Sequence, residues 1–455
     1  FGGGGGTGII QLVDPLVLTL GATRTLSMYA GNNILIESNI LASGAPLNLH
    51  LYSGYGTSAG DVEVTNGAII NLNNGYLNIV AQTGVILGNM TPISITAGSM
   101  NITNQLSGDI SLASGSSLTA TNPLGLYPGS ISFFNSASGG STVIYGTVTT
   151  NGGGFMSLSN SSFTGYSGGS INGVGSIIIQ APDSITFQPG FQTNFTGSNP
   201  FLGLSGGSST TLSGNFTAPN IQLFGSSLAL ASGTTVNGYN QVFMVADALS
   251  MGAGASIYSN YRIAIQNLTD GTPISIGSGS GLVIPNLSQT TFNAPEIAIG
   301  MPGYTVTDPL SGTTYTYLGT SNIYVNTAIN RPGGSVLFGT SGSVTGTGAI
   351  TADKVGIKAA GSVNLLGNNA VNYLQINAGG NIDYKNTVPL TTYNYSGYYG
   401  EWRASPGYTP PAELLITPGI VSGGIVNLGT TSGDMTLLGP VRGTGGVNLY
   451  ATAGS

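Results

Sequence analysis

The sequence is poor in charge and contains no cysteine. Only 5% of its 455 residues are charged, against roughly 25% in an ordinary soluble domain. A chain without cysteine cannot be trapped by disulfide bonds, which suits a protein that crosses a membrane unfolded. Low charge together with 40% hydrophobic residues argues against plain disorder, because disordered chains combine high charge with low hydrophobicity. We therefore expect the apolar residues to be buried.

Basic clusters and long apolar runs are missing as well. The 8 basic and 15 acidic residues give a net charge of −7 and are spread thinly along the chain. Nucleic-acid binding is not expected, because the phosphate backbone requires a patch of Lys and Arg. No run of about twenty apolar residues occurs, so no helix is expected to span a bilayer.

The residue types that act in catalysis or bind metal ions are too few or too scattered to form a catalytic site. His50 is the only histidine, so neither a His-based triad nor a multi-His metal site can be built, and we expect it on the outward side of a strand. Glycoside-cleaving enzymes need clustered carboxylates, whereas the acids of this chain are dispersed, as are Asp61, Glu63, Asp183, Asp353 and Asp434. We predict no catalytic residue, no metal ligand and no cofactor.

Short alternations of apolar and polar residues are the main feature that is present. The stretch from Gly31 to Gln82 contains the same pattern twice, with ILI and LNLHL followed by VEV and YLNIV. Period-2 alternation over a few residues, bounded by Gly, Asn and Ser, indicates short half-buried strands. Recurrence after about 16 to 30 residues indicates stacked units, because one unit cannot bury its apolar face alone.

We therefore predict an all-β fold, a right-handed parallel β-helix (β-solenoid) that forms an elongated rod of about twenty coils. Leu77 and Ile79 are expected to point inward and Asn78 outward. Asparagines at the turns are expected either to form ladders between coils or to act singly, because Asn tolerates left-handed backbone; they are Asn32-Asn33, Asn73-Asn74 and Asn368-Asn369. Seven phenylalanines are expected to stack inside the coils: Phe133, Phe134, Phe187, Phe191, Phe195, Phe216 and Phe243.

The sequence predicts four parts. Residues 1–25 are expected to form a Gly-rich amino-terminal arm that acts as a cap or as a strand between subunits. Residues 26–383 are expected to form the parallel β-helix, and residues 384–413 an excursion rich in aromatic residues and Pro. The β-helix is expected to continue over residues 414–455.

The segment 384–413 is the predicted binding surface. It holds the only Trp of the chain and no short alternating triplet, so we expect a loop that leaves the coil. Tyr, Trp and Arg dominate binding hot spots, and loops on rigid scaffolds often carry function. The candidate contact residues are Tyr393, Tyr395, Tyr398, Tyr399, Trp402 and Arg403. Three interpretations stay open: the loop covers its own helix, contacts a neighbouring subunit, or binds a glycan or receptor. A smaller excursion is expected at residues 301–318.

Four stretches of the chain share one kind of repeat, namely GNNILIESNI, GDVEVTNGAIINLNNGYLNIVA, INAGGNIDYKN and GTGGVNLYATAGS. They resemble the repeat region of filamentous-haemagglutinin-like exoproteins, the large secreted adhesins of Gram-negative bacteria usually exported by two-partner secretion. The resemblance covers most of the chain. It implies a right-handed parallel β-helix, an extracellular location or the bacterial cell surface, and a role in adhesion, biofilm or contact-dependent competition.

Two classes of function follow. The first is a secreted structural or adhesive surface protein without catalysis, acting as an adhesin or as the subunit of an extracellular filament or matrix. The alternative is a carbohydrate-active β-helix enzyme, a polysaccharide lyase or tailspike-like hydrolase, which would need a groove with clustered acids. The expected partners are a second copy of the chain, joined head to tail through uncovered end coils, or a glycan or receptor of a cell surface or matrix.

Overall fold

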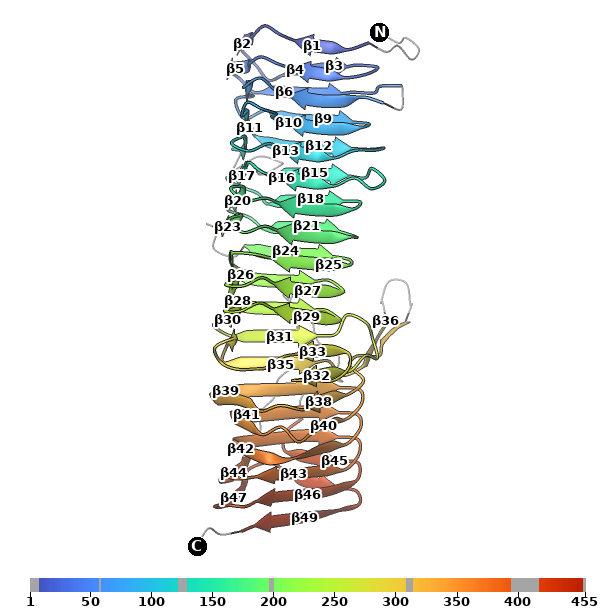
Figure 1. Ribbon diagram of the computed structural model, residues 1–455, viewed down its shortest axis with the longest axis vertical. Helices are drawn as coiled ribbons and strands as arrows, with labels where there is room; N and C mark the ends of the chain where they lie inside the picture. The colour runs from blue at the N-terminus through green and yellow to red at the C-terminus, as the bar shows by residue number, and fades with distance from the viewer. Residues whose placement is uncertain are drawn as a thin grey trace. The chain divides into compact units, whose positions relative to one another are not determined.

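The computed structural model describes residues 8–56, 59–121, 129–195, 200–307, 314–393 and 417–452. These residues form β-strands joined by turns, and the strands pair in parallel along long ladders (Figure 1). The predicted fold class, an all-β parallel β-helix, is confirmed, whereas its handedness and number of coils stay predictions. The chain forms two compact units: unit 1 is Phe1–Leu223 with Ala229–Asn237, and unit 2 is Phe224–Leu228 with Gly238–Ser455.

Each coil of unit 1 contains three short strands, so its strands form three parallel ladders. The first ladder consists of β1 (Ile10–Leu12), β4 (Ile34–Ile36), β7 (Asp61–Val64), β10 (Gly84–Leu87), β13 (Ile110–Leu112), β16 (Thr142–Ile144), β19 (Ser162–Gly165), β22 (Ser184–Phe187) and β25 (Ser209–Leu212). The second consists of β2 (Leu16–Leu20), β5 (Ile40–Gly44), β8 (Ile69–Asn71), β11 (Ser94–Ala97), β14 (Ser117–Ala120), β17 (Thr147–Thr150), β20 (Ser170–Gly173) and β23 (Gln192–Phe195). The third consists of β3 (Arg24–Tyr29), β6 (Leu47–Tyr52), β9 (Tyr76–Ala81), β12 (Ser99–Asn104), β15 (Ile131–Asn135), β18 (Phe155–Ser159), β21 (Ile177–Ala181) and β24 (Phe201–Gly206).

Unit 2 is also built from parallel ladders, but several of its strands are longer. The chain passes between the units within β26 (Asn215–Phe224), β27 (Ser227–Leu230) and β28 (Thr235–Val245). The first strands of unit 2 are β29 (Ala248–Met251), β30 (Ser256–Ser259), β31 (Arg262–Gln266), β32 (Ile274–Ile276), β33 (Leu282–Ile284), β34 (Phe292–Asn293), β35 (Glu296–Gly300), β36 (Tyr304–Thr307) and β37 (Thr314–Tyr317). They are followed by β38 (Ile323–Val325), β39 (Ile329–Thr340), β40 (Val344–Gly346), β41 (Ile350–Ala359), β42 (Val363–Ala378), β43 (Ile382–Asn386) and β44 (Leu390–Thr392). The last are β45 (Ile420–Ser422), β46 (Ile425–Thr430), β47 (Met435–Leu437), β48 (Val441–Gly443) and β49 (Gly446–Ala451).

Alternation decides which side chains point inward. In β9, Leu77 and Ile79 are fully buried, whereas Asn78 between them is partly exposed, as predicted. Leu77 lies in register with Leu49 of the preceding coil and Met100 of the following coil. Because neighbouring strands lie about 4.8 Å apart, each inward side chain packs against its counterparts and each coil removes its neighbour's apolar face from water.

Four of the seven predicted phenylalanines lie inside the coils of unit 1, namely Phe133, Phe187, Phe191 and Phe216. The prediction is wrong for Phe134, which is partly exposed because the alternation of β15 directs Phe133 inward. It is also wrong for Phe195, which ends β23 and is only half-buried. Phe243 is buried, but on the outer side of β28, where it packs with Val245 and with alanines of the next strands.

Turns between strands use the residues that tolerate left-handed backbone. Asn73 and Asn74 have φ values of 47° and 67°, which few residues other than Gly and Asn adopt readily. Gly108 has a φ of 79°, and a Cβ added there would lie 1.8 Å from the carbonyl oxygen of Thr83. Only glycine fits this close approach between coils.

Asparagines also stack inside the coil, so the ladder interpretation holds at one of the predicted pairs. Asn369 is fully buried and lies in register with the buried Asn386 of the next coil. The Asn369 side-chain amide donates to the carbonyl oxygens of Leu365 and Lys385, both at 2.9 Å, and its oxygen accepts from the Ile350 N–H at 2.9 Å. These bonds satisfy backbone groups that the corner of the coil would otherwise leave unpaired in the interior.

Part of the predicted amino-terminal arm and cap, residues 1–25, consists of strands. Strands β1, β2 and β3 form a regular coil and pair with β4, β5 and β6 of the next one. Pro15 does not interrupt this coil, because it lies at the corner between β1 and β2, where the ladder needs no N–H.

The predicted excursion, residues 384–413, begins too early. Residues 382–386 and 390–392 form β43 and β44, and Tyr384 lies in register with Leu365 and Leu428 in the core. The alternation of β43 places this tyrosine inward, and burial raises the pKa of its hydroxyl. The ladder resumes at Ile420. The segment between β44 and β45 is therefore residues 393–419, of which 394–416 lie outside the described residues.

The smaller predicted excursion is an antiparallel hairpin of β36 and β37 in unit 2 (Figure 1). The Tyr304 and Tyr317 rings stack across it with centroids 4.7 Å apart. At its base, the Thr320 N–H donates to the Met301 carbonyl at 2.9 Å, and the Met301 N–H donates to the Thr320 hydroxyl at 3.1 Å. The hairpin thus leaves and re-enters the coil at one hydrogen-bonded point.

The packing of β9 predicts a face-dependent response to charge. Leu77→Asp should place an unpaired carboxylate between coils and destabilise unit 1 by about 4 kcal/mol or more, whereas Asn78→Asp should change its stability by under about 1 kcal/mol. Protease resistance and thermal unfolding of the two variants measure the difference. Equal loss in both variants would show that the burial of Leu77 does not hold the coils together.

Candidate functional site

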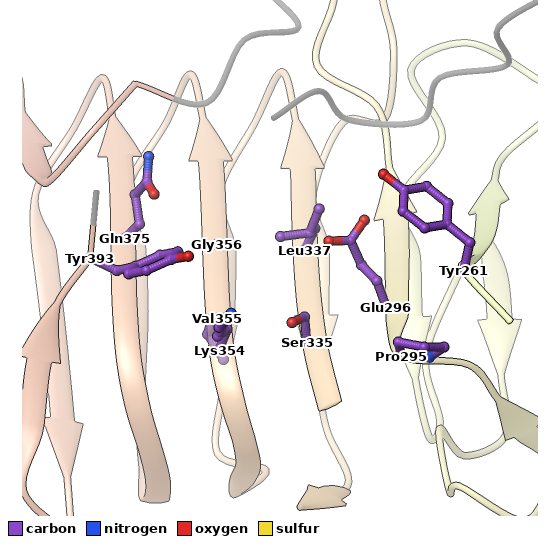
Figure 2. A pocket seen from close by; sticks show the side chains of 10 residues that line it. All are labelled: Tyr261, Pro295, Glu296, Ser335, Leu337, Lys354, Val355, Gly356, Gln375 and Tyr393. Atoms are coloured by element: carbon purple, nitrogen blue, oxygen red, sulfur yellow. The ribbon is translucent and has the colours of Figure 1, made fainter. Parts of the chain in front are cut away.

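A pocket lies on the outer face of unit 2, over strands β31, β35, β39, β41 and β42 (Figure 2). We call it the outer pocket. Parallel pairing aligns one outward residue of each strand in a first row, Arg262, Glu296, Ser335, Lys354 and Tyr373. The outward residues two positions further along form a second row, Ala264, Ala298, Leu337, Gly356 and Gln375. Strand register therefore assembles the pocket from separate parts of the sequence.

The first row carries opposite charges. The Arg262 guanidinium donates from Nε and Nη2 to Oε1 of Glu296, with both distances 2.5 Å. Both side chains are largely buried, with 6% of Arg262 and 16% of Glu296 exposed. This pair neutralises the carboxylate. Lys354, two strands further along, pairs with no carboxylate of the described residues, so the first row, with Arg262, Glu296 and Lys354, carries one net positive charge.

Two tyrosines, Tyr261 and Tyr393, lie at opposite ends of the pocket, as Figure 2 shows. Tyr261 is 59% exposed, and the Arg262 guanidinium lies 5.6 Å from its ring centroid. The Lys354 ammonium lies 5.1 Å from the centroid of the Tyr393 ring, which also packs against Tyr373 at 5.4 Å. Each ring is thus held next to a cation, an arrangement worth about 0.5–1 kcal/mol at an exposed site.

The floor of the pocket is hollow because its second row contains small residues. Gly356 has no side chain, and it lies between Leu337 and Gln375, which are only 3% and 2% exposed. The cavity above this floor has a volume of about 210 Å³. The Gln375 amide donates to the Thr417 carbonyl, which ties the floor to the point where the chain re-enters the coil.

A buried arginine supports the pocket from the inside of unit 2. Arg331 is fully buried, and its guanidinium donates to the carbonyl of Phe292 at 2.5 Å and to the carbonyl of Ala294. Phe292 belongs to β34, and Ala294 to the bend that leads through Pro295 into Glu296. Burial lowers the pKa of Arg331 to about 10, so the side chain stays charged at neutral pH. The next residue, Pro332, has no backbone N–H, so it cannot donate to these carbonyls in place of Arg331.

The structure brings one of the predicted contact residues into the outer pocket. Tyr393 lines it, while Tyr395, Tyr398, Tyr399, Trp402 and Arg403 lie outside the described residues. Sequence reasoning missed Tyr261, Glu296 and Lys354. The alternation in APEIAIG does place Glu296 outward, but no local pattern indicates that Lys354 lies two strands away.

The other residues considered from the sequence lie on the outer surface of unit 1. His50 points outward between the rings of Tyr52 and Tyr76, with centroids 6.2 and 6.1 Å away. Burial raises the pKa of Glu63, and the carboxylates of Asp61 and Glu37 add to the effect. Within the described ranges, no group of three or more His, Cys, Asp or Glu side chains is placed to hold a metal ion.

The outer pocket differs in its lining from the site of a glycoside hydrolase. Glycoside hydrolysis requires two carboxyl groups on either side of the scissile bond. The residues that line this pocket supply one carboxylate, that of Glu296, and Arg262 forms an ion pair with it. What the pocket presents to a ligand is two aromatic rings, an ammonium group and a partly apolar floor.

No helix suited to spanning a bilayer occurs among the described residues.

No family model, curated protein or solved structure matches the chain.

The contacts of Arg331 predict a defined loss of stability. Arg331→Met should leave the Phe292 and Ala294 carbonyls buried without donors and destabilise unit 2 by about 1–3 kcal/mol, even though it removes a buried charge. Arg331→Lys should recover part of the loss. Chemical denaturation measures both, with the exposed Arg442→Met as the control. Unchanged or increased stability of Arg331→Met would show that the charge costs more than its hydrogen bonds return.

Proposed function

We propose that the chain is the β-helical part of an extracellular structural and adhesive protein of the filamentous-haemagglutinin-like kind, without catalysis. The observation that carries this proposal is the outer pocket. Its charged row and its floor are set by backbone register on five parallel strands, and tyrosines stand at both ends. A preorganised surface of this kind loses little conformational entropy when a partner binds.

The composition of the pocket favours an adhesive role over the enzymatic alternative. Tyr and Arg are the residues that most often dominate binding energy, and the lining offers Tyr261, Tyr393 and Lys354 on a rigid support. A glycoside hydrolase would need a second carboxyl group beside Glu296, and the lining of the pocket supplies only one. A glycan or receptor of a cell surface or matrix is the partner that fits a pocket with rings, one cation and hydrogen-bonding groups.

An extracellular location, at the bacterial cell surface or in the medium, accompanies this function. The repeat pattern supports it, as does a chain without cysteine that can be exported unfolded. Low surface charge and turns rich in Gly and Asn suit a scaffold whose stability comes from stacked coils.

Adhesion of coated beads tests the proposal. Beads that carry the chain should bind erythrocytes or a bacterial biofilm matrix. Tyr261→Ala/Tyr393→Ala should lower the number of bound beads about tenfold, because both rings that bound the pocket are lost. Tyr239→Ala is the matched control, since Tyr239 is 47% exposed and does not line the pocket.

Two results would contradict the proposal. One is that wild-type beads adhere to neither surface, or that the double variant binds as well as the wild type. The other is that the protein releases new reducing ends or unsaturated products from polysaccharides, which would favour the carbohydrate-active alternative.

We also propose that copies of the chain join end to end. One side of β49 pairs with β46, and no described strand pairs with its other side. Its residues are exposed throughout, among them Val447 at 39%, Leu449 at 41% and Tyr450 at 59%. In unit 1, β1 to β3 likewise pair with described strands on one side only. Unpaired strand edges accept further strands, from more of the same protein or from a second copy.

Electron microscopy of the purified chain measures this assembly. The intact chain should form filaments, and deletion of residues 1–20 should shorten or abolish them, because β1 and β2 are removed. Filaments of unchanged length after the deletion would show that the first coil is not the joint. The proposal fails altogether if the intact protein forms none.

A further inference from the structure

A second surface, on unit 1, combines aromatic rings with a ladder of side-chain amides. It lies on the outer face of β3, β6, β9 and β12, where strand register aligns two neighbouring columns of residues. The first column is Tyr29, Tyr52, Val80 and Thr103, and the second is Ser27, His50, Asn78 and Asn101. We call these eight residues, with Tyr55 and Tyr76 beside them, the aromatic–amide face.

The rings of this face are stacked and accessible. Tyr29 and Tyr52 are parallel to within 4°, with centroids 4.9 Å apart, and the ring of Tyr55 meets Tyr29 edge-on at 5.1 Å. Tyr29 is 52% exposed and Tyr55 is 63% exposed. A tyrosine presents an apolar ring and a polar hydroxyl together, which suits ligands that are themselves apolar on one side and polar at the edge.

The amides are fixed in one orientation by a chain of hydrogen bonds. The Asn101 amide donates to the Asn78 side-chain oxygen at 2.9 Å, and the Asn78 amide donates to the Tyr52 hydroxyl at 2.9 Å. Because the Tyr52 oxygen already accepts a bond, its own proton is directed elsewhere. The ladder therefore offers donors and acceptors at set positions beside the rings.

Charge is absent from both columns of this face. Neither column contains Asp, Glu, Lys or Arg, and His50 lies between the rings of Tyr52 and Tyr76. Polyanions such as nucleic acids or acidic polysaccharides need cationic partners. The composition of the face thus excludes charge as the basis of recognition.

We propose that the aromatic–amide face binds a neutral polysaccharide. A pyranose ring has apolar C–H faces and a rim of hydroxyl groups that both donate and accept, which matches exposed tyrosine rings flanked by amides. A pyranose ring is also about as long as the spacing between strands, about 4.8 Å. Successive sugars of an extended chain can therefore lie over successive coils, because the repeat of the polysaccharide is similar to the spacing of the strands. This site is independent of the outer pocket.

Affinity electrophoresis in gels that contain neutral polysaccharides tests the assignment. The probes are hydroxyethyl cellulose, laminarin, α-mannan and galactomannan, with heparin and polygalacturonate as charged comparisons. The wild-type chain should be retarded by at least one neutral probe, equally at about 50 and 500 mM NaCl, because no charge is involved. Tyr29→Ala/Tyr52→Ala should weaken binding about tenfold or more, while Tyr29→Phe, which keeps the ring and leaves the Tyr52 hydroxyl in the amide ladder, should retain most of it.

Two matched variants separate recognition from folding. Tyr145→Ala/Tyr166→Ala removes another stacked outward pair of unit 1, with centroids 4.0 Å apart, and should bind as the wild type does. Asn78→Leu breaks the amide ladder and should weaken binding while leaving protease resistance unchanged, because Asn78 points outward.

Several outcomes would overturn the assignment. One is that none of the neutral probes retards the chain. Another is that only the charged probes retard it and that salt abolishes this retardation. The third is that Tyr29→Ala/Tyr52→Ala and Tyr145→Ala/Tyr166→Ala weaken binding equally. Failure of bead adhesion through the outer pocket would leave this result unaffected, because the two experiments change different residues in different units.

Discussion

Parallel register between neighbouring coils is the constraint on which the rest of the structure depends. A strand of three to six residues buries too little apolar surface to fold alone, so each depends on the strands before and after it. The match of Leu77 with Leu49 and Met100 is one instance of a contact repeated from coil to coil. A shift by one residue would turn the inward side chains of a strand to solvent. Register therefore fixes the interior, and it also fixes which outward side chains become neighbours.

Both surfaces proposed to bind ligands result from this alignment of outward side chains. In the outer pocket, Glu296 lies beside Arg262 because β35 pairs with β31, and Lys354 is near because β39 lies between. On unit 1, the same rule aligns Asn78 with Asn101 and Tyr29 with Tyr52. A helical or globular scaffold would need separate elements to hold such groups, whereas here the backbone ladder that stabilises the fold also orders them.

The sequence alone was sufficient for features that depend on local alternation. The inward positions of Leu77 and Ile79 follow from a pattern a few residues long, and the excursion predicted at residues 301–318 contains the hairpin, although the sequence did not indicate its strand pairing. Two predictions are wrong for different reasons. The predicted excursion includes Tyr384 because residues 384–413 contain no short alternating triplet, yet Tyr384 is an inward residue of β43. Phe134 is predicted inside together with its neighbour Phe133, although alternation directs only one of the two inward. The outer pocket was largely out of reach, because its register depends on the lengths of turns and insertions between strands. The burial of Arg331 could not be predicted, because its two acceptors, the carbonyls of Phe292 and Ala294, come close to it only in the folded chain.

The hairpin of β36 and β37 also bears on how such a protein can change. Its two ends meet at the hydrogen bonds between Met301 and Thr320, so the coil on either side is closed whatever the hairpin contains. A segment inserted at such a point alters neither the register of the ladders nor the packing of the interior. Lineages of such chains can therefore gain, lose or exchange surface modules by insertion and deletion at coil corners. The same property makes the Met301–Thr320 junction a natural site for grafting a foreign peptide.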